Sequence, residues 1–321
     1  MGVTAMSSDR KEINVKGKRV AVDSIVIDGK PIVVTGNLLK IARIKDELCD
    51  DGIHNPENII NELKKIKRAD ILTFDQKLPE SEPKFKYYFE WDNFAVLQIK
   101  SFEYWWKIQI HNEARRMVRK AEKNGVVVKV VPFTDELVAG IKGIYDESPM
   151  RQGKPFWHYK KDLNAIKEDN LPFLERSEFI GAYCDGELIG FEKIIYTGSR
   201  ADPTQLISKI KDRDKSPTNA LVAKSIEVCA QKGISYLTYG NYYYGNKQAD
   251  SLLEFKKRNG FEKMEVPRYY IPLTAKGGIA LRLRLYRKPV ELLPSFLLNN
   301  LLKARAKFYS VKYSRDYNAF Q

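Results

Sequence analysis

The feature that most constrains the fold is a pair of alternating, apolar segments joined by an Asp-Gly dipeptide. Residues 178–184 (EFIGAYC) precede Asp185-Gly186, and residues 187–196 (ELIGFEKIIY) follow it. Asp-Gly between two such runs is among the strongest short-range signals for a β-hairpin, because both turn positions require positive φ. The sequence therefore predicts an antiparallel hairpin in the second half of the chain.

The segments around this hairpin are predicted to alternate between helix and strand. Gly233 and Gly260 each follow a periodic stretch, the place that glycine takes just after a helix. The order predicts a mixed α+β domain in which helices cover a sheet. The expected elements are a strand at 126–131, helices at 134–146 and 161–170, a strand near 204–208, a helix at 218–232, a strand at 234–240, a helix at 248–259 and a strand at 261–273.

The first third of the chain is predicted to contain both strands and helices. Residues 19–35 are β-branched around Asp28-Gly29, which predicts another hairpin. Asn37 precedes a stretch with helical periodicity to about residue 49, and the clearest helix is expected from Ser101 to Asn124. Its predicted buried stripe consists of Trp106, Ile110, Ala114, Met117 and Ala121. Its other arc carries Arg115, Arg116, Arg119, Lys120 and Lys123.

The chain is basic, and part of the excess charge is concentrated near its C-terminal end. Its 321 residues carry 55 Lys and Arg against 41 Asp and Glu, a formal net charge of +14. Residues 276–321 hold ten of these cations and two acidic residues. We expect a basic amphipathic tail that favours anionic partners such as tRNA, a phosphorylated lipid or a membrane surface. A solvated basic helix face explains the same charges.

The sequence shows no pattern for export or membrane insertion. The first ten residues lack an apolar run with a cleavage site, and no eighteen consecutive residues are apolar. The cysteines Cys49, Cys184 and Cys229 are far apart and are expected to be reduced. We therefore expect a cytoplasmic protein, with peripheral contact at the inner membrane surface through 276–321.

The order of elements around the central hairpin resembles the core of the GNAT acyltransferases. The resemblance rests on FIGAYCDGELIGFEKIIY (179–196) and on the closing helix and strand LLEFKKRNGFEKMEV (252–266). It is closer to the Fem-like aminoacyltransferases, which have two GNAT-like halves, because RRMVRKAEKNGVVVKVV (115–131) resembles their junction. The resemblance implies a mixed α/β fold with two GNAT-like halves in tandem and a basic helical tail. The implied divisions are an extension at 1–18, a first half at 19–125, the GNAT core at 126–275 and the tail at 276–321.

The same resemblance implies an acyl donor that is not permanently bound, either acyl-CoA or aminoacyl-tRNA. GNAT enzymes that use acyl-CoA carry a glycine-rich loop before a helix, where backbone N–H groups hold the pyrophosphate. Here that stretch reads KDRDKSPTNALVAK (211–224), without glycine. Its candidate cofactor-binding residues are Lys215, Ser216, Thr218 and Asn219, with Ser216 or Thr218 as the helix cap. Fem-like enzymes similarly lack this loop and use aminoacyl-tRNA, which suits a basic protein.

Acyl transfer needs a base, donors for the developing oxyanion and positioning of both substrates, but no covalent nucleophile. The loop 148–159 concentrates suitable side chains. Arg151 and Gln152 are candidates for binding a carboxylate or phosphate, Trp157 and Tyr159 for packing on substrate, and His158 for shuttling a proton. Packing of these aromatic rings and a structural His158 explain the same residues. With only three histidines, a histidine metal centre is not expected.

Two further segments offer candidate site residues. YGNYYYGNKQ (239–248) follows a core strand, and Asn241, Tyr243 and Lys247 are its candidates for hydrogen-bond donors or an acid. Near residue 90, Trp91 and Asp92 are candidates for binding substrate, with Glu90 or Asp92 as an alternative base. Surface packing and turn capping account for either segment without a catalytic role.

The sequence thus favours a transferase that moves an acyl or aminoacyl group directly to an amine or hydroxyl of a cell-envelope, sugar or peptide acceptor. The acceptor is expected to be a small molecule or a lipid-linked precursor. One alternative is an acyl-CoA-dependent N-acetyltransferase. Another is a non-catalytic GNAT-like module that binds RNA or anionic membrane.

Overall fold

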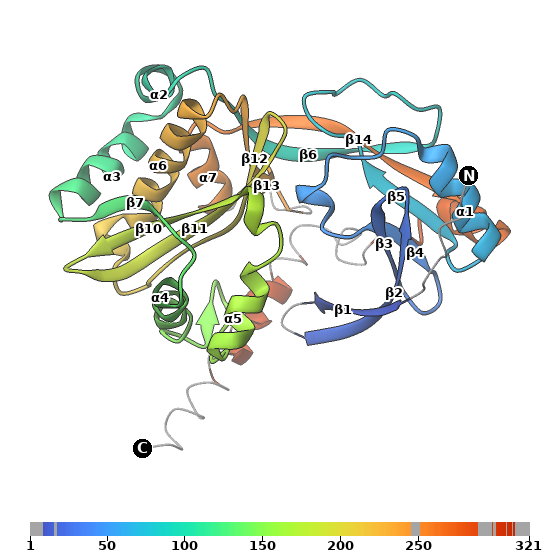
Figure 1. Cartoon of the computed structure of the whole chain (residues 1–321), viewed down its shortest axis with the longest axis horizontal. Coiled ribbons are helices and arrows are strands. Elements are labelled where there is room, and N and C mark those ends of the chain that lie inside the picture. The colour runs from blue at the N-terminus through green and yellow to red at the C-terminus, as the bar shows by residue number, and fades with distance from the viewer. Residues whose placement is uncertain are drawn as a thin grey trace. The chain divides into compact units, whose positions relative to one another are not determined.

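The chain folds into two compact units, shown in Figure 1. The computed structural model describes residues 9–15, 18–244, 251–287, 297, 300–305, 307–309 and 311. Unit 1 holds residues 1–94 and 264–292, and unit 2 holds residues 95–263 and 293–321. The chain crosses from one unit to the other within β6 (Phe89–Gln98) and again within β14 (Glu262–Pro272).

Unit 1 is built on a sheet in the order β1-β2-β3-β4-β5-β14. Neighbouring strands are antiparallel except β4 and β5, which run parallel and share only the pairs Ile41↔Ile71 and Ala42↔Leu72. Helix α1 (Pro56–Ile66) makes the crossover between them, as a parallel pair requires. The other strands are β1 (Asp9–Val15), β2 (Lys18–Ile27), β3 (Lys30–Thr35), β4 (Ile41–Ile44) and β5 (Ile71–Asp75).

One face of this sheet packs on α1. Ile59 and Leu63 of α1 are buried with Leu72, Phe74 and other side chains of the strands. Helix α8 (Ala275–Arg282) also belongs to unit 1, where Ala280 packs in a small cluster with Ile71 and Tyr286. Within the expected C-terminal tail, Ala280 and Tyr286 therefore pack against β5 of the same unit.

Unit 2 repeats this arrangement in the order β6-β13-β12-β11-β10-β7. Strands β7, β10, β11 and β12 are antiparallel neighbours, whereas β12 and β13 are parallel and share only Arg200↔Tyr236 and Ala201↔Leu237. Helix α6 (Pro217–Gln231) makes this second crossover. The strands are β7 (Val127–Val131), β10 (Ser177–Cys184), β11 (Glu187–Thr197), β12 (Arg200–Ser208) and β13 (Tyr236–Asn241). The predicted Asp185-Gly186 hairpin is confirmed, with φ of 52° and 80° at its turn.

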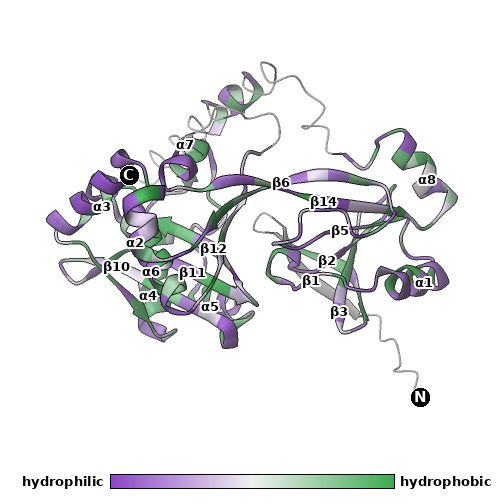
Figure 2. Cartoon of the chain, turned by 90° about the horizontal axis from the view of Figure 1, so that it is seen from above, coloured by the Kyte–Doolittle hydropathy of each residue, from purple (hydrophilic) through white to green (hydrophobic). Residues whose placement is uncertain are grey.

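Helices cover both faces of the sheet in unit 2 (Figure 1). On one face α6 packs with α3 (Asn112–Lys123), and on the other lie α4 (Asp135–Tyr145) and α5 (Leu163–Asn170). The described part of the predicted helix at 248–259 is α7 (Ser251–Arg258). Figure 2 shows the strands of this unit as largely hydrophobic and α3 as largely hydrophilic.

The limits of the two units differ from the expected divisions at 125/126 and 275/276. Helix α3 belongs to unit 2 because Ala114, Val118 and Ala121 are buried in the same core as α6. The assignment of one GNAT-like half to each expected division stays a prediction.

The predicted helix from Asn37 to about Cys49 is wrong. This stretch forms β4 and a single 3₁₀ turn, η1 (Glu47–Cys49). Ala42 pairs with Val34 on one side and with Leu72 on the other, so the sheet satisfies the backbone groups that a helix would have bonded internally.

The predicted continuous helix from Ser101 to Asn124 is broken near Ile110. It consists of α2 (Phe102–Tyr104), a π-helix, η2 (Trp105–Gln109), and α3. Because the break shifts the phase of the helix, the predicted buried stripe is only partly right: Val118 is buried, and Met117 is 37% exposed.

Candidate functional site

The loop between β12 and α6 is the place where the sequence predicted a phosphate-binding site. It comprises residues 209–216 and leads into a 15-residue helix. A helix N-terminus of this length presents free N–H groups and a partial positive charge to an anion. Whether a pyrophosphate can bind here therefore depends on whether the backbone N–H groups and the lysines of this loop already have partners within the protein.

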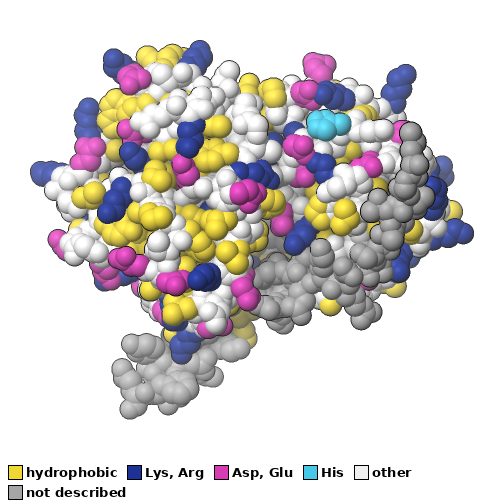
Figure 3. Space-filling view, viewed as in Figure 1, with side chains coloured by type: hydrophobic (Ala, Val, Ile, Leu, Met, Phe, Trp, Pro, Cys, Tyr) yellow, Lys and Arg dark blue, Asp and Glu magenta, His cyan; other side chains and the backbone are white. Residues whose placement is uncertain are grey.

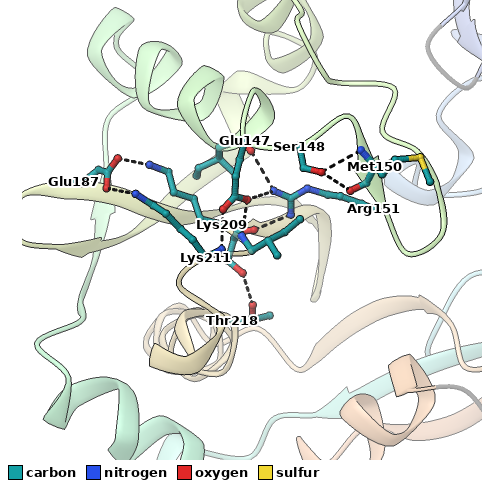
Figure 4. Close-up of polar contacts among 11 residues, drawn as sticks. Glu147, Ser148, Met150, Arg151, Glu187, Lys209, Lys211 and Thr218 are labelled. Carbon is teal, nitrogen blue, oxygen red and sulfur yellow. Dashed lines mark hydrogen bonds and ion pairs between the residues drawn. The ribbon is translucent and has the colours of Figure 1, made fainter. Parts of the chain in front are cut away.

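The carboxylate of Glu147 already occupies two backbone N–H groups of this loop. It accepts hydrogen bonds from the N–H of Ile210 at 2.5 Å and of Lys211 at 2.8 Å. Arg151 donates to the same carboxylate at 3.2 Å, to the carbonyl of Ser208 at 2.7 Å and to that of Ile144 at 3.1 Å. Figure 4 shows Glu147 and Arg151 locked against the loop in this way. Glu147 thus stands where an anionic ligand would otherwise accept these hydrogen bonds.

The lysines of the loop are also paired within the protein. Lys209 and Lys211 both form ion pairs with Glu187, and Lys215 pairs with Asp212 at 2.9 Å. The hydrogen bond from Lys215 to Asp212 holds the pKa of the ammonium above its usual value. These internal carboxylates reduce the positive potential that a pyrophosphate would meet.

The predicted capping role of Ser216 or Thr218 is wrong. Ser216 has a φ of 59°, makes no capping hydrogen bond and lies 3.5 Å from the sulfur of Met117. The Thr218 hydroxyl lies 3.0 Å from the hydroxyl of Ser208. The backbone carbonyl of Ser208 accepts a hydrogen bond from Arg151. Asn219 is half-buried in the first turn of α6. The structure therefore brings the Arg151 loop and the start of α6 together, as parts of one packed region.

The loop 148–159 folds into a short hairpin of β8 (Met150–Arg151) and β9 (Lys154–Pro155). Gln152 is exposed at its turn, with a φ of 52°. Trp157 is exposed beneath the ammonium of Lys161, and Tyr159 is half-buried. The predicted bidentate binding by Arg151 is contradicted, because its two terminal nitrogens already donate to protein oxygens.

His158 is a core side chain. It is 5% exposed, its ring centre lies 4.2 Å from that of Tyr145, and its Nδ1 has no hydrogen-bond partner. Burial, with the nearby charges of Lys161 and Arg151, lowers the pKa of His158 to about 3. The imidazole is therefore neutral at pH 7, which contradicts the expected proton shuttle near neutrality.

We predict that the free energy of unfolding falls less between pH 7 and pH 5 in His158→Gln than in wild type. The imidazole has a lower pKa in the folded than in the unfolded chain, so its contribution to stability is present above about pH 6.5 and is lost as the pH falls. Wild type should lose about 2 kcal/mol of unfolding free energy from this group between pH 7 and pH 5. Urea unfolding at both values measures the difference. A catalytic His158 would instead be revealed by loss of transfer activity in a variant that stays folded.

The candidate residues Asn241, Tyr243 and Lys247 lie at the end of β13 and in the segment that follows it, not in the loop at 148–159. The carbonyl of Asn241 accepts a hydrogen bond from the buried Lys256, and the ring of Tyr243 lies 5.8 Å from the ammonium of Lys263. Lys247 is outside the described residues. Asn241 and Tyr243 follow the point at which the parallel pair β12 and β13 diverges, so they stay candidates for contact with a reacting group.

Unit 1 contains a charged cluster that the sequence analysis missed except for Asp92. Arg268 donates to Glu47 and Asp92, each at 3.2 Å, and also pairs with Asp75. Burial and then the carboxylate of Glu47 raise the pKa of Asp75. Trp91 is exposed, with its ring edge-on to Phe89. A single charged residue within an apolar strand, as in VPRYYI around Arg268, was the available signal for this cluster.

Neither Glu90 nor Asp92 is placed as a free base. Glu90 accepts hydrogen bonds from Tyr88 at 3.0 Å and from Tyr286 at 2.5 Å, and it pairs with Arg287. Asp92 is held by Arg268. Of the two, Asp92 stays a candidate for substrate contact because it belongs to the charged cluster.

Comparison with solved structures identifies the fold. The chain is similar to a crystal structure of FemX, with a TM-score of 0.54 and 12% identity over 85% of this chain and 90% of that one. It is similar to L-PGS from Bacillus licheniformis, with a TM-score of 0.52 and 15% identity over 82% and 88%. It is also similar to the C-terminal domain of a protein from Agrobacterium fabrum described as a lysylphosphatidylglycerol synthetase, with a TM-score of 0.53 and 13% identity over 81% and 87%. No protein-family model and no curated protein sequence matches. The predicted GNAT-like, Fem-like fold is confirmed.

Proposed function

We propose that this protein is a transferase that takes an aminoacyl group from aminoacyl-tRNA and moves it directly to an amine or hydroxyl acceptor. The fold it shares with FemX and L-PGS supports a transferase, and its similarity to a lysylphosphatidylglycerol synthetase supports a lipid-linked or cell-envelope acceptor. In the step itself, the acceptor nitrogen or oxygen attacks the ester carbonyl carbon. The bond to the ribose oxygen breaks, and the proton lost by the acceptor is balanced by the one that the ribose hydroxyl gains.

The observation that carries the choice of donor is the position of Glu147. Two backbone N–H groups of the loop before α6, those of Ile210 and Lys211, are already bonded to the Glu147 carboxylate and are not free for an acyl-CoA pyrophosphate. Two anions cannot share these donors without strong repulsion. This arrangement favours a donor whose phosphates bind elsewhere on the protein.

The test of this proposal is equilibrium binding of acetyl-CoA, a long-chain acyl-CoA and aminoacyl-tRNA to the purified protein, followed by a transfer assay with a labelled aminoacyl group. We expect saturable binding of aminoacyl-tRNA and none of the CoA esters. Micromolar binding of a CoA ester would instead support the acyl-CoA-dependent acetyltransferase. Binding of uncharged RNA without any transfer would support the non-catalytic module.

The exposed arc of α3 is our proposed contact for the phosphates of the tRNA. The side chains of Arg116, Lys120 and Lys123 are exposed and make no hydrogen bond or ion pair with the residues that the structure describes. A surface hollow of about 470 Å³ is lined by Asn112, Arg115, Arg116 and Arg119. Elsewhere, as on the face shown in Figure 3, Lys and Arg are interspersed with Asp and Glu. The apolar side of α3 is buried, so this helix cannot insert that side into a membrane.

We predict that Arg116→Gln with Arg119→Gln weakens binding of uncharged tRNA roughly tenfold at low salt and reduces the slope of log affinity against log salt by about 2. Fluorescence anisotropy over a salt series measures both quantities. The matched control is Lys64→Gln with Arg68→Gln, which removes two exposed cations from unit 1. Equal losses in both double variants would show that only net charge matters.

A peripheral membrane contact through residues 276–321 also stays a proposal. Among the described residues of this segment, Ile279, Leu283 and Leu285 are at least 59% exposed beside basic side chains. None of the described helices has the length and apolar composition to cross a bilayer.

We predict that Leu283→Glu with Leu285→Glu lowers the fraction that floats with anionic vesicles several-fold, because both the apolar contact and the attraction to anionic lipid are lost. Leu163→Glu with Leu171→Glu, at two exposed leucines of unit 2, makes the same change of charge and should float like wild type. Flotation unaffected by the double variant would contradict this contact.

A further inference from the structure

Strand β7 forms one end of the sheet in unit 2. It pairs with β10 along its whole length, from Phe179↔Val131 to Tyr183↔Val127. Among the described residues, no strand pairs with its other side. Alternate residues of such an end strand point their N–H and C=O groups away from the sheet, so β7 presents unpaired backbone donors and acceptors along that side.

The residues of this edge are apolar and accessible. The strand reads VVKVV, and Val127 and Val130 are 60% and 43% exposed. Side chains alternate between the two faces of a strand, so these two valines point to opposite faces. Each face of β7 therefore exposes a valine beside the free edge, and β-branched residues favour pairing as strands.

Charged residues, which commonly protect an edge strand from pairing with another chain, are sparse in β7. The end strand of the sheet in unit 1, β1, contains four charged residues among seven, and β7 contains one among five. That one is Lys129, whose ammonium lies 5.0 Å from the centre of the Tyr183 ring. Because Tyr183 belongs to the neighbouring strand β10, the ammonium lies over the sheet of its own unit and leaves the edge unprotected.

We propose that β7 is the interface of a symmetric dimer, in which it pairs antiparallel with β7 of a second copy of this chain. A strand that pairs antiparallel with its own copy lies on a two-fold axis, so the contact is closed after two chains. Both copies then supply the same exposed valines, and neither is left with an unpaired edge at β7. The sheet of unit 2 continues through the axis into the partner subunit.

Lys129 selects the register of this pair. When a sheet continues across a two-fold axis, paired residues share a face and one residue pairs with its own copy. An axis at Lys129, the middle of β7, places two lysines directly opposite each other, which is unfavourable. An axis at Val130 brings Pro132, which has no N–H, into the ladder. An axis at Val128 avoids both, and it pairs Val127 with Lys129 of the partner subunit, whose methylene groups cover the valine.

Sedimentation velocity of the whole protein between about 1 and 100 µM tests the association, because a pair of short strands is a small interface and the dimer should dissociate on dilution. Val127→Lys with Val130→Lys should weaken the dimer at least about tenfold, since it places a lysine opposite Lys129 of the partner subunit. The matched control is Val20→Lys with Val26→Lys. It adds the same charge at exposed valines of β2, which has a strand on each side, and should dimerise like wild type.

Disulfide crosslinking tests the register. The three natural cysteines are buried and do not compete. Val128→Cys places each thiol opposite its own copy, at a Cα separation of about 4.5 to 5.5 Å that a disulfide can span. Mild oxidation should therefore convert Val128→Cys into a covalent dimer, whereas Val130→Cys should stay uncrosslinked.

Several outcomes would overturn the proposal. One is a monomer at all of these concentrations, and another is a dimer that Val127→Lys with Val130→Lys leaves unchanged while circular dichroism shows the wild-type fold. Species that keep growing with concentration would contradict the closed two-fold contact. In a mixture, preferential crosslinking of Val128→Cys to Val130→Cys would place the axis at Lys129 and refute the register. None of these measurements needs a donor or an acceptor, so their failure leaves the proposed function untouched.

Discussion

Replacing Arg268 with methionine is expected to lower the free energy of unfolding by about 3 to 5 kcal/mol at pH 7. Arg268 is the shared partner of Glu47, Asp75 and Asp92, and its removal leaves three neighbouring carboxylates without a cation. Methionine fills similar volume, so the loss measures the charge and not a cavity. Denaturant unfolding followed by circular dichroism gives the value.

The effect of Arg268→Met should depend on pH in a defined direction. Without the guanidinium, burial and repulsion from Glu47 and Asp92 raise the pKa of Asp75 further above its value in the unfolded chain. The folded variant then binds more protons than the unfolded one, so its stability falls as the pH rises from about 4. Because the pKa of Asp75 is about 8 in wild type, the deficit relative to wild type should be nearly constant between pH 5 and pH 7 and grow above about pH 8, where only the wild-type carboxyl ionises.

Arg268→Lys is the matched variant, because it keeps one charge and loses the planar fork. It should show a smaller deficit with a weaker dependence on pH. A deficit in Arg268→Met below about 1 kcal/mol, or one that does not grow between pH 7 and pH 9, would show that the cluster does not depend on this guanidinium.

Replacing Glu147 with alanine is expected to lower the free energy of unfolding by about 3 kcal/mol. The change leaves the N–H groups of Ile210 and Lys211 without an acceptor and removes the only carboxylate bonded to Arg151 among the described residues. Both Glu147 and Arg151 are mostly buried, so water replaces these contacts poorly. Thermal and denaturant unfolding measure the loss.

Glu187→Gln is the matched control for this variant. Glu187 pairs with Lys209 and Lys211 of the same loop but is 52% exposed, so its loss should cost less than about 1 kcal/mol. If Glu147→Ala is as mild as Glu187→Gln, the carboxylate does not hold the loop. If wild type and Glu147→Ala bind acetyl-CoA equally tightly, it does not occupy the pyrophosphate position either.

The local sequence pattern was sufficient to predict most helices and strands of unit 2. The Asp185-Gly186 turn and the alternation on either side of it predicted the hairpin that the structure contains. Gly233 and Gly260 marked the ends of helices in the right places. The two wrong helix predictions, at 37–49 and 101–124, have the same cause, which is backbone hydrogen bonding to a distant part of the chain. Strand β4 pairs with a strand on each side. The helix from Ser101 breaks where the N–H of His111 bonds to the carbonyl of Arg258.

Candidate site residues were predicted less well than the secondary structure. A side chain of suitable chemistry can be bonded to, or buried by, residues far away in the sequence, and it is then not available to a substrate. Arg151 and His158 have the residue types of a binding and a catalytic group, yet one is bonded to protein oxygens and the other is buried and neutral. Asp75 and Glu147 drew no attention in the sequence, since no local motif surrounds them.

The sequence by itself determined the alternation of strands and helices, the mixed fold and the basic character of the chain, because these depend on residues a few positions apart. The tertiary structure decided which charges meet. Glu147 bonds to a backbone N–H 63 positions away, and Arg268 pairs with an aspartate 193 positions away. Such pairs depend on strand order and register, and a shift of one residue would turn each side chain to the other face of its sheet.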